Sequence, residues 1–99
     1  MDDEQRDSLL SVANEALAET LRAQRARRRL LQKDVAERAG ISLTTIKRYE
    51  SAETAPDVAQ LMALCRALDI STQAFLDAAE KAAAEKLASR NATTESVRE

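Results

Sequence analysis

Histidine is absent from this chain of 99 residues, which excludes histidine-based catalysis and histidine metal ligands. A single cysteine, Cys65, excludes an intrachain disulfide and fits a reducing cytoplasm. No apolar run approaches the length that spans a bilayer, and the acidic start MDDEQRD is unlike a signal peptide. We therefore expect a cytoplasmic protein without a membrane segment.

Glycine, proline and aromatic residues are nearly absent as well. The sequence has one glycine (Gly40), one proline (Pro56) and two aromatic residues (Tyr49 and Phe75). Alanine and leucine are abundant, and no stretch alternates polar and apolar residues as an exposed strand does. The length suits one domain with a modest core. We predict an all-α fold.

Sites for catalysis, cofactors or metals are also missing from the sequence. There is no glycine-rich loop and no pair of carboxylates placed for acid–base work. Cys65 falls on an apolar helical face, which is typical of a core cysteine. We expect no catalytic residues, no bound cofactor or metal, and no enzymatic activity.

Charge is small overall but unevenly distributed. The net charge is −2, yet residues 21–49 hold nine basic and two acidic residues, a local net charge of +7. Residues 1–20 carry −5 and residues 50–99 carry −4. A basic centre between acidic flanks suits a surface that faces phosphate groups, and a solvated charged helix would give the same count.

The stretch from Gln32 to Ser51 contains two short helical patterns around the glycine. Apolar residues fall on one face of 32–39 and again of 43–50. Gly40 can adopt the left-handed conformation that ends the first helix, and Ser42 can cap the second. The stretch therefore predicts a helix-turn-helix, whose second helix can enter the DNA major groove.

Helical patterns also flank this stretch. An apolar stripe (Leu10, Ala13, Leu17, Leu21), widened by Leu9, Val12 and Ala16, predicts helix over residues 1–29. Asn14 could cap a separate later start, so one helix and two helices both remain open. A fourth helix starts at Asp57, after the proline. A fifth starts after Ser71 and runs to about Arg90, and residues 91–99 are expected to be a disordered tail.

From about Leu17 to Leu76 the chain resembles the Cro/lambda-repressor-type helix-turn-helix family, the xenobiotic-response-element class. The residues that carry the resemblance are Arg25, Gln32, Val35, Ala36, Gly40, Ile41, Ser42, Ile46, Glu50, Pro56 and the segment LMALCRALDIS from Leu61 to Ser71. The resemblance implies a five-helix, lambda-repressor-like DNA-binding domain over 17–76. It would be preceded by a helical extension over 1–16 and followed by a second over 77–99.

The resemblance also implies roles for particular residues. Arg25 and Glu50 match an ion pair that holds the reading unit to the first helix. Inward-facing Ile46 and Tyr49 would leave four residues of the reading helix exposed for base contacts: Leu43, Thr44, Lys47 and Arg48. The residues expected at phosphates are Gln32, Lys33, Ser42, Thr45, Arg28 and Arg29.

Four positions depart from the family pattern. Leu31 stands where a capping residue is usual, and Arg29 stands where a glycine ends the first helix. Gln24 occupies an apolar position of that helix, which we expect to weaken the packing there. Ser51-Ala52-Glu53 replaces an Asn-Gly-basic segment, so a left-handed glycine is missing and Glu53 brings a carboxylate close to the expected phosphates.

Two functions follow from these expectations. The first is a sequence-specific DNA-binding transcription regulator, in the simplest case a repressor, that binds double-stranded DNA as a homodimer. The alternative is an antitoxin or another partner-binding helical module, which uses the N- or C-terminal extension. That alternative rests on a small-residue surface formed by Ala78, Ala79, Ala82, Ala83 and Leu87.

Overall fold

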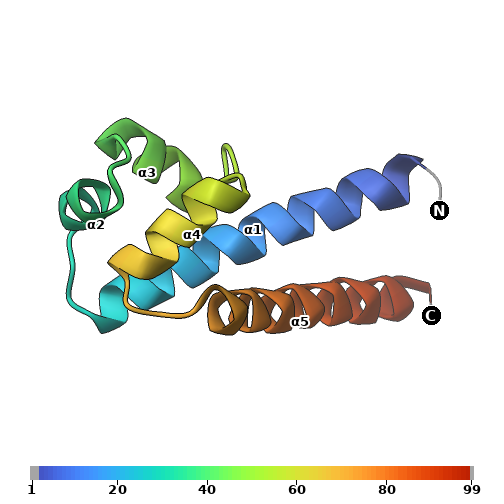
Figure 1. Cartoon of the computed structure of the whole chain (residues 1–99). Helices are drawn as coiled ribbons and strands as arrows, with labels where there is room; N and C mark the ends of the chain where they lie inside the picture. Colours follow the sequence, from blue (N-terminus) through green and yellow to red (C-terminus); the bar gives the residue numbers. More distant parts are fainter. Residues whose placement is uncertain (1–2, 99) are drawn as a thin grey trace.

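The computed structural model describes the backbone of residues 3–98 and the side chains of residues 8–90. Over residues 3–98 the chain forms five helices and no strand, so the predicted all-α, five-helix fold is confirmed. The helices are α1 (Asp3–Arg27), α2 (Gln32–Ala39), α3 (Leu43–Glu50), α4 (Val58–Ala67) and α5 (Thr72–Arg98). The short helices α2 and α3 lie at one end of the molecule, and the start of α1 and the end of α5 lie at the other (Figure 1).

The first helix is continuous from Asp3 to Arg27, so one helix rather than two covers this region. Asn14 lies inside it and starts no separate helix. The buried face agrees with the predicted stripe only in part: Val12, Ala16 and Leu21 are buried, whereas Leu10 is 60% exposed. The reason is that α1 packs against both α3 and α5, so two faces of the helix are covered instead of one stripe.

Helix α5 runs antiparallel to α1 and packs along it (Figure 1). Lys86 Nζ lies 2.8 Å from Glu19 Oε2, and Arg90 Nη2 lies 3.3 Å from Glu15 Oε2. Because the partners on each helix are four residues apart, the two ion pairs form successive rungs between the helices. The hydrogen bond from Lys86, with the positive charge of Lys86, holds the pKa of the Glu19 carboxyl below its usual range.

The alanine-rich part of α5 packs on α1 of the same chain. Ala79 is only 6% exposed, and the other residues of the predicted small-residue surface are half-buried. On one side of the α1–α5 seam Ala78 and Ala82 lie beside Thr20 and Ala23. Small side chains here let the two helices approach closely, so much of this surface is already used within the chain.

The last helix continues beyond its predicted end. Helical backbone runs through residues 91–98, where we expected a disordered tail. No glycine or proline follows Pro56, so nothing in the sequence stops the helix before that point. The side chains of residues 91–99 lie outside the described part of the structure.

The core lies where all five helices meet, and α2 contributes Val35 and Ala36 to it. Leu21, Ile46, Leu64 and Phe75 are each at most 2% exposed and belong to one apolar cluster. Cys65 lies in the same cluster at 1% exposed, as expected of a core cysteine. Burial raises the pKa of its thiol, although a hydrogen bond with Thr72 acts in the opposite direction.

Four helix ends share one backbone conformation. A residue one or two positions after the helix has a positive φ in each case: Arg29 (54°), Gly40 (69°), Ala52 (62°) and Asp69 (53°). In each case the next N–H donates to the carbonyl five positions earlier, at 3.0 to 3.2 Å, as in a Schellman motif. The departures at Arg29 and Ala52 therefore leave the turn geometry unchanged, and a residue with a Cβ adopts it at some energetic cost.

Candidate nucleic-acid interface

The helix-turn-helix occupies α2, the turn at Gly40 and α3. The positive φ of Gly40 lets the Ile41 N–H reach the carbonyl of Ala36 at 3.1 Å, which ends α2. Ser42 then caps α3, because its Oγ accepts from the Thr45 N–H at 3.2 Å. The Ser42 hydroxyl also donates to Thr45 Oγ1 at 2.8 Å. The two hydroxyls expected at phosphates thus hold each other beside the N-terminus of α3.

The start of α2 has only half of a capping arrangement. The side chain of Leu31 makes no cap hydrogen bond, and Leu31 is 59% exposed. Asp34 partly compensates, since its carboxylate accepts from the Leu31 N–H at 2.8 Å. This contact fixes the direction in which the chain enters α2 and places a negative charge in the first helical turn, where the helix dipole favours it.

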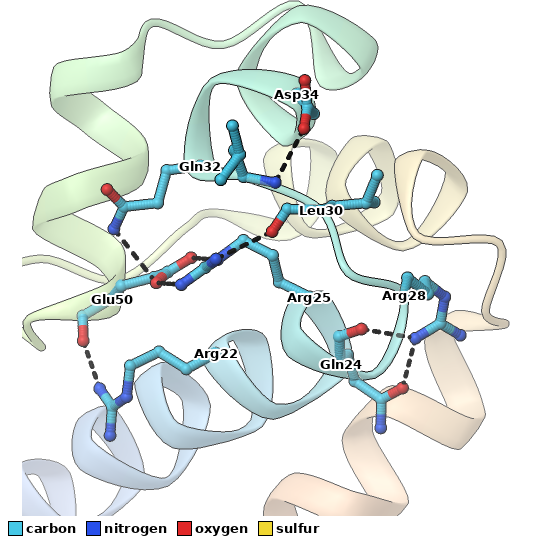
Figure 2. Close-up of polar contacts among 9 residues, drawn as sticks. Arg22, Gln24, Arg25, Arg28, Leu30, Gln32, Asp34 and Glu50 are labelled. Carbon is cyan, nitrogen blue, oxygen red and sulfur yellow. Dashed lines mark hydrogen bonds and ion pairs between the residues drawn. The ribbon is translucent and has the colours of Figure 1, made fainter.

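Arg25 and Glu50 form a two-bonded ion pair between α1 and the end of α3 (Figure 2). Arg25 Nε donates to Glu50 Oε2 at 2.7 Å, and Nη2 donates to Oε1 at 2.9 Å. The third arm of the guanidinium, Nη1, donates to the carbonyl of Leu30 at 2.9 Å. The hydrogen bond with Glu50 raises the pKa of Arg25, so the guanidinium stays charged.

Two further side chains converge on Glu50 (Figure 2). Gln32 Nε2 donates to Glu50 Oε1 at 3.2 Å, and Arg22 Nη1 donates to the Glu50 carbonyl oxygen. Glu50 is 4% exposed, so its charge depends on these partners. We call Arg22, Arg25, Gln32 and Glu50 the α3 clamp, because it joins α1, α2 and α3 at one point.

The outer face of α3 carries the four residues predicted to contact bases. Leu43 is 38% exposed, and Thr44, Lys47 and Arg48 are also exposed. Ile46 at 0% and Tyr49 at 4% face the core, as their spacing predicted. The clamp at one end and the Ser42 cap at the other fix this face relative to the rest of the domain.

The basic side chains around the turn before α2 differ in exposure: some fold back on the protein and others face solvent. Arg28 is half-buried and folds back on α1, where its Nη1 donates to the main-chain oxygen and to Oε1 of Gln24, both at 2.8 Å. Arg29 and Lys33 are exposed. Lys33 also borders a shallow groove between α2 and α3, next to Gly40 and Leu43. The expected phosphate contacts therefore have different access to solvent, with Arg29 and Lys33 the more open.

Two features of the site were not predicted from the sequence. Arg22 was missed as a member of the clamp, although it lies three residues before Arg25 and so on the same side of α1. Gln24 was expected to weaken the packing of α1. It is 7% exposed, and its Oε1 accepts from Arg28, so the buried amide has a partner.

The sequence and the fold both place this chain in a known class. The family model of the helix-turn-helix, of the Cro/C1 type, matches residues 21–75, more than half of the chain, so the chain belongs to this family. This membership supports a DNA-binding transcriptional regulator. No curated protein matches the chain.

Two crystal structures of the clp gene regulator ClgR from Corynebacterium glutamicum share the fold. One has a TM-score of 0.78 at 24% sequence identity, with 83% of this chain and 87% of that chain covered. The other has a TM-score of 0.66 at 26% identity, with 70% of this chain and 90% of that chain covered. The similarity to the first extends beyond the residues that the family model matches.

Two other properties concern the described residues alone. None of their helices is long and apolar enough to cross a membrane. They also contain no group of three or more histidine, cysteine or acidic residues that could hold a metal ion.

Proposed function

We propose that this chain is a cytoplasmic, sequence-specific transcription regulator that reads the DNA major groove with α3. The observation that carries the proposal is the exposed face of α3 fixed by the clamp at Glu50. An exposed helix face carrying cations and small side chains suits insertion into a groove lined by base edges. Fixing that helix in advance lowers the entropy lost when it binds.

The residues of this face have distinct chemistry. Arg48 and Lys47 can donate to guanine O6 and N7, whereas Thr44 and Leu43 can contact a thymine methyl group. Contacts to phosphates would come from the remaining predicted residues: Gln32, Lys33, Ser42, Thr45, Arg28 and Arg29. Gln32 can donate to Glu50 and to a phosphate at the same time, because its side-chain amide has a second N–H beside the one bonded to Glu50.

DNA titration tests this function. A pool of random duplexes should yield a bound sequence, and binding should weaken steeply as salt rises because bound cations release counterions. The double variant Lys47→Ala/Arg48→Ala should lose this binding, whereas Lys81→Ala, which removes a charge from α5, should keep it. Absence of binding to any duplex at low salt would rule out the proposed function.

We further propose that the regulator is a homodimer that acts as a repressor. Dimeric regulators of this kind read two half-sites about 34 Å apart, and occupancy of such a site can block polymerase. An apolar groove along the α1–α5 seam, lined by Ala13, Leu17, Leu76 and Ala83, is a suitable dimer face. Leu10 lies on the same face of α1 and is 60% exposed, so two copies related by a twofold axis could each insert Leu10 into the other's groove.

Sedimentation equilibrium tests the dimer. The unchanged chain should have twice the mass of one chain, and Leu10→Asp should reduce it to a single mass. Val58→Asp alters an even more exposed apolar residue, 73% exposed on α4, and should leave the dimer intact. A monomeric unchanged chain, or an intact dimer in Leu10→Asp, contradicts this assignment. Repression is tested by placing the selected duplex across a promoter, where the bound protein should lower transcription.

The second candidate function is that of an antitoxin or another partner-binding module. The same apolar groove favours it, because a helix of a different protein could occupy the groove in place of a second copy. The DNA titration separates the two candidate functions in part, since a module that binds only a protein partner does not have to bind DNA. A chain that binds no DNA and is monomeric would favour this function.

A further inference from the structure

The carboxylate of Glu53 is brought back to the reading helix by the turn that ends it. Ala52 has a φ of 62°, and this left-handed residue reverses the chain directly after α3. The Glu53 N–H then donates to the carbonyl of Arg48 at 3.0 Å, and the Ser51 hydroxyl donates to the same oxygen at 3.2 Å. The main chain of Glu53 is therefore fixed over the last turn of α3, at the level of Arg48.

This placement pairs Glu53 with one of the residues proposed to read bases. Glu53 Oε2 lies 4.0 Å from Arg48 Nε, and the two side chains are 65% and 56% exposed. A pair this exposed contributes little to folding stability. Its position matters more, since it adds a negative charge to the face that would approach DNA.

We infer that Glu53 is a specificity-determining residue, because it restrains Arg48 and reduces the attraction of this face for phosphates in general. The inference rests on the proposed DNA-binding function. A carboxylate on the Nε side leaves the two terminal nitrogens of the guanidinium available for guanine O6 and N7. The same carboxylate cancels part of the charge that drives sequence-independent binding.

The two effects favour one class of ligand. On a duplex that offers guanine opposite Arg48, the base contact replaces the hydration that Arg48 loses. Glu53 repels the phosphates of every duplex alike. On other sequences, however, Arg48 can contact only phosphates, and because Glu53 restrains Arg48 it weakens those contacts as well. Glu53 thus weakens binding to unrelated DNA more than binding to the selected duplex, which raises the ratio between the two affinities.

A double-mutant cycle tests this inference. The four proteins are the unchanged chain, Glu53→Gln, Arg48→Met and the double variant. Each is titrated with the duplex selected from the random pool and with an unrelated duplex of equal length. Glu53→Gln should tighten binding to the unrelated duplex about two- to five-fold, the size of an exposed charge interaction. Binding to the selected duplex should change less, so the affinity ratio falls.

In the Arg48→Met background, Glu53→Gln should change both affinities by the same factor, because the residue that it restrains is gone. Glu37→Gln is the matched control, since it removes the same charge from an exposed position of α2. The inference is overturned if Glu37→Gln lowers the affinity ratio as much as Glu53→Gln does. It is also overturned if the ratio is independent of Glu53, or if Glu53 has the same effect on the ratio without Arg48.

Failure of the inference can be told apart from failure of the proposed function. If the unchanged chain binds no duplex, the proposed function fails. If it binds with a measurable preference and Glu53 does not affect that preference, only the inference fails. Thermal unfolding of each variant should match the unchanged chain, because both side chains are largely exposed.

Discussion

Arg25 and Glu50 lie 25 positions apart and are joined by two hydrogen bonds, at 2.7 and 2.9 Å, that fasten α1 to the end of α3. Glu50 is 4% exposed on its side chain and Arg25 is 21% exposed. A charge this deeply buried is tolerated only while its partners remain in place. The pair therefore couples the position of α3 to the integrity of the whole domain.

Removing one member of the pair should cost more than removing both. Arg25→Met leaves the Glu50 carboxylate buried without its main partner, and we expect a loss of about 3 kcal/mol in the free energy of unfolding. The double variant Arg25→Met/Glu50→Leu should recover much of that loss, because no uncompensated charge remains. Urea unfolding monitored by circular dichroism measures both, and equal losses in the two variants would contradict the role of the buried charge.

Ala52→Gly should stabilise the protein. Ala52 has a φ of 62°, which glycine adopts without the steric cost of a Cβ. We expect a gain of about 0.5 to 1 kcal/mol after allowing for the greater freedom of glycine in the unfolded chain. Ala84→Gly is the matched control, since the same change inside α5 should lower stability by about 1 kcal/mol. A higher thermal midpoint in Ala52→Gly together with a lower one in Ala84→Gly supports the left-handed conformation of residue 52. A lower midpoint in both variants would argue against it.

The Glu19–Lys86 pair should appear in the acid dependence of stability. The pKa of Glu19 is lowered, first by its hydrogen bond with Lys86 and then by the Lys86 charge. The pair therefore contributes fully above the pKa of the unfolded carboxyl, and its contribution disappears as the pH falls through the lower, folded pKa. In Glu19→Gln, the thermal midpoint should therefore fall less on acidification than it does in the unchanged chain. If the thermal midpoint of Glu19→Gln falls with pH as steeply as that of the unchanged chain, the lowered pKa of Glu19 is contradicted.

Cys65 should be unreactive in the folded protein. It is 1% exposed, and burial raises the pKa of its thiol, so little thiolate forms at neutral pH. Ellman's reagent should react with one equivalent of thiol only as fast as the protein unfolds, and immediately in concentrated urea. Rapid reaction of the native protein would show that the α4 core opens easily.

The parts of the fold that were predicted correctly depend on local signals. The expected bounds of α2 and α3 match the structure because Gly40 and Ser42 mark the turn through their own backbone and side-chain chemistry. The inward positions of Ile46 and Tyr49 follow from helical periodicity alone. The Arg25–Glu50 contact could be expected only through the resemblance, since nothing local joins residues so far apart.

The parts that were missed depend on tertiary structure. Arg29 and Ala52 adopt the left-handed conformation although a Cβ disfavours it, and nothing in their side chains signals it in the sequence. Asp69 adopts it too, and aspartate visits this region more readily. Leu10 belongs to a helical stripe in the sequence, yet its burial depends on which faces α3 and α5 cover. The alanines of α5 suggested a surface for a partner, because the sequence does not reveal that α1 already occupies it.

The antiparallel packing of α1 and α5 also has a practical consequence. Because α1 runs toward α2 and α5 runs back along it, the start of α1 and the end of α5 lie at the end of the molecule opposite α2 and α3 (Figure 1). A fluorescent protein or an affinity tag fused at either terminus would therefore be held away from α3. Labelled forms of this protein should keep the outer face of α3 unobstructed, which makes them suitable for single-molecule and surface-immobilised binding measurements.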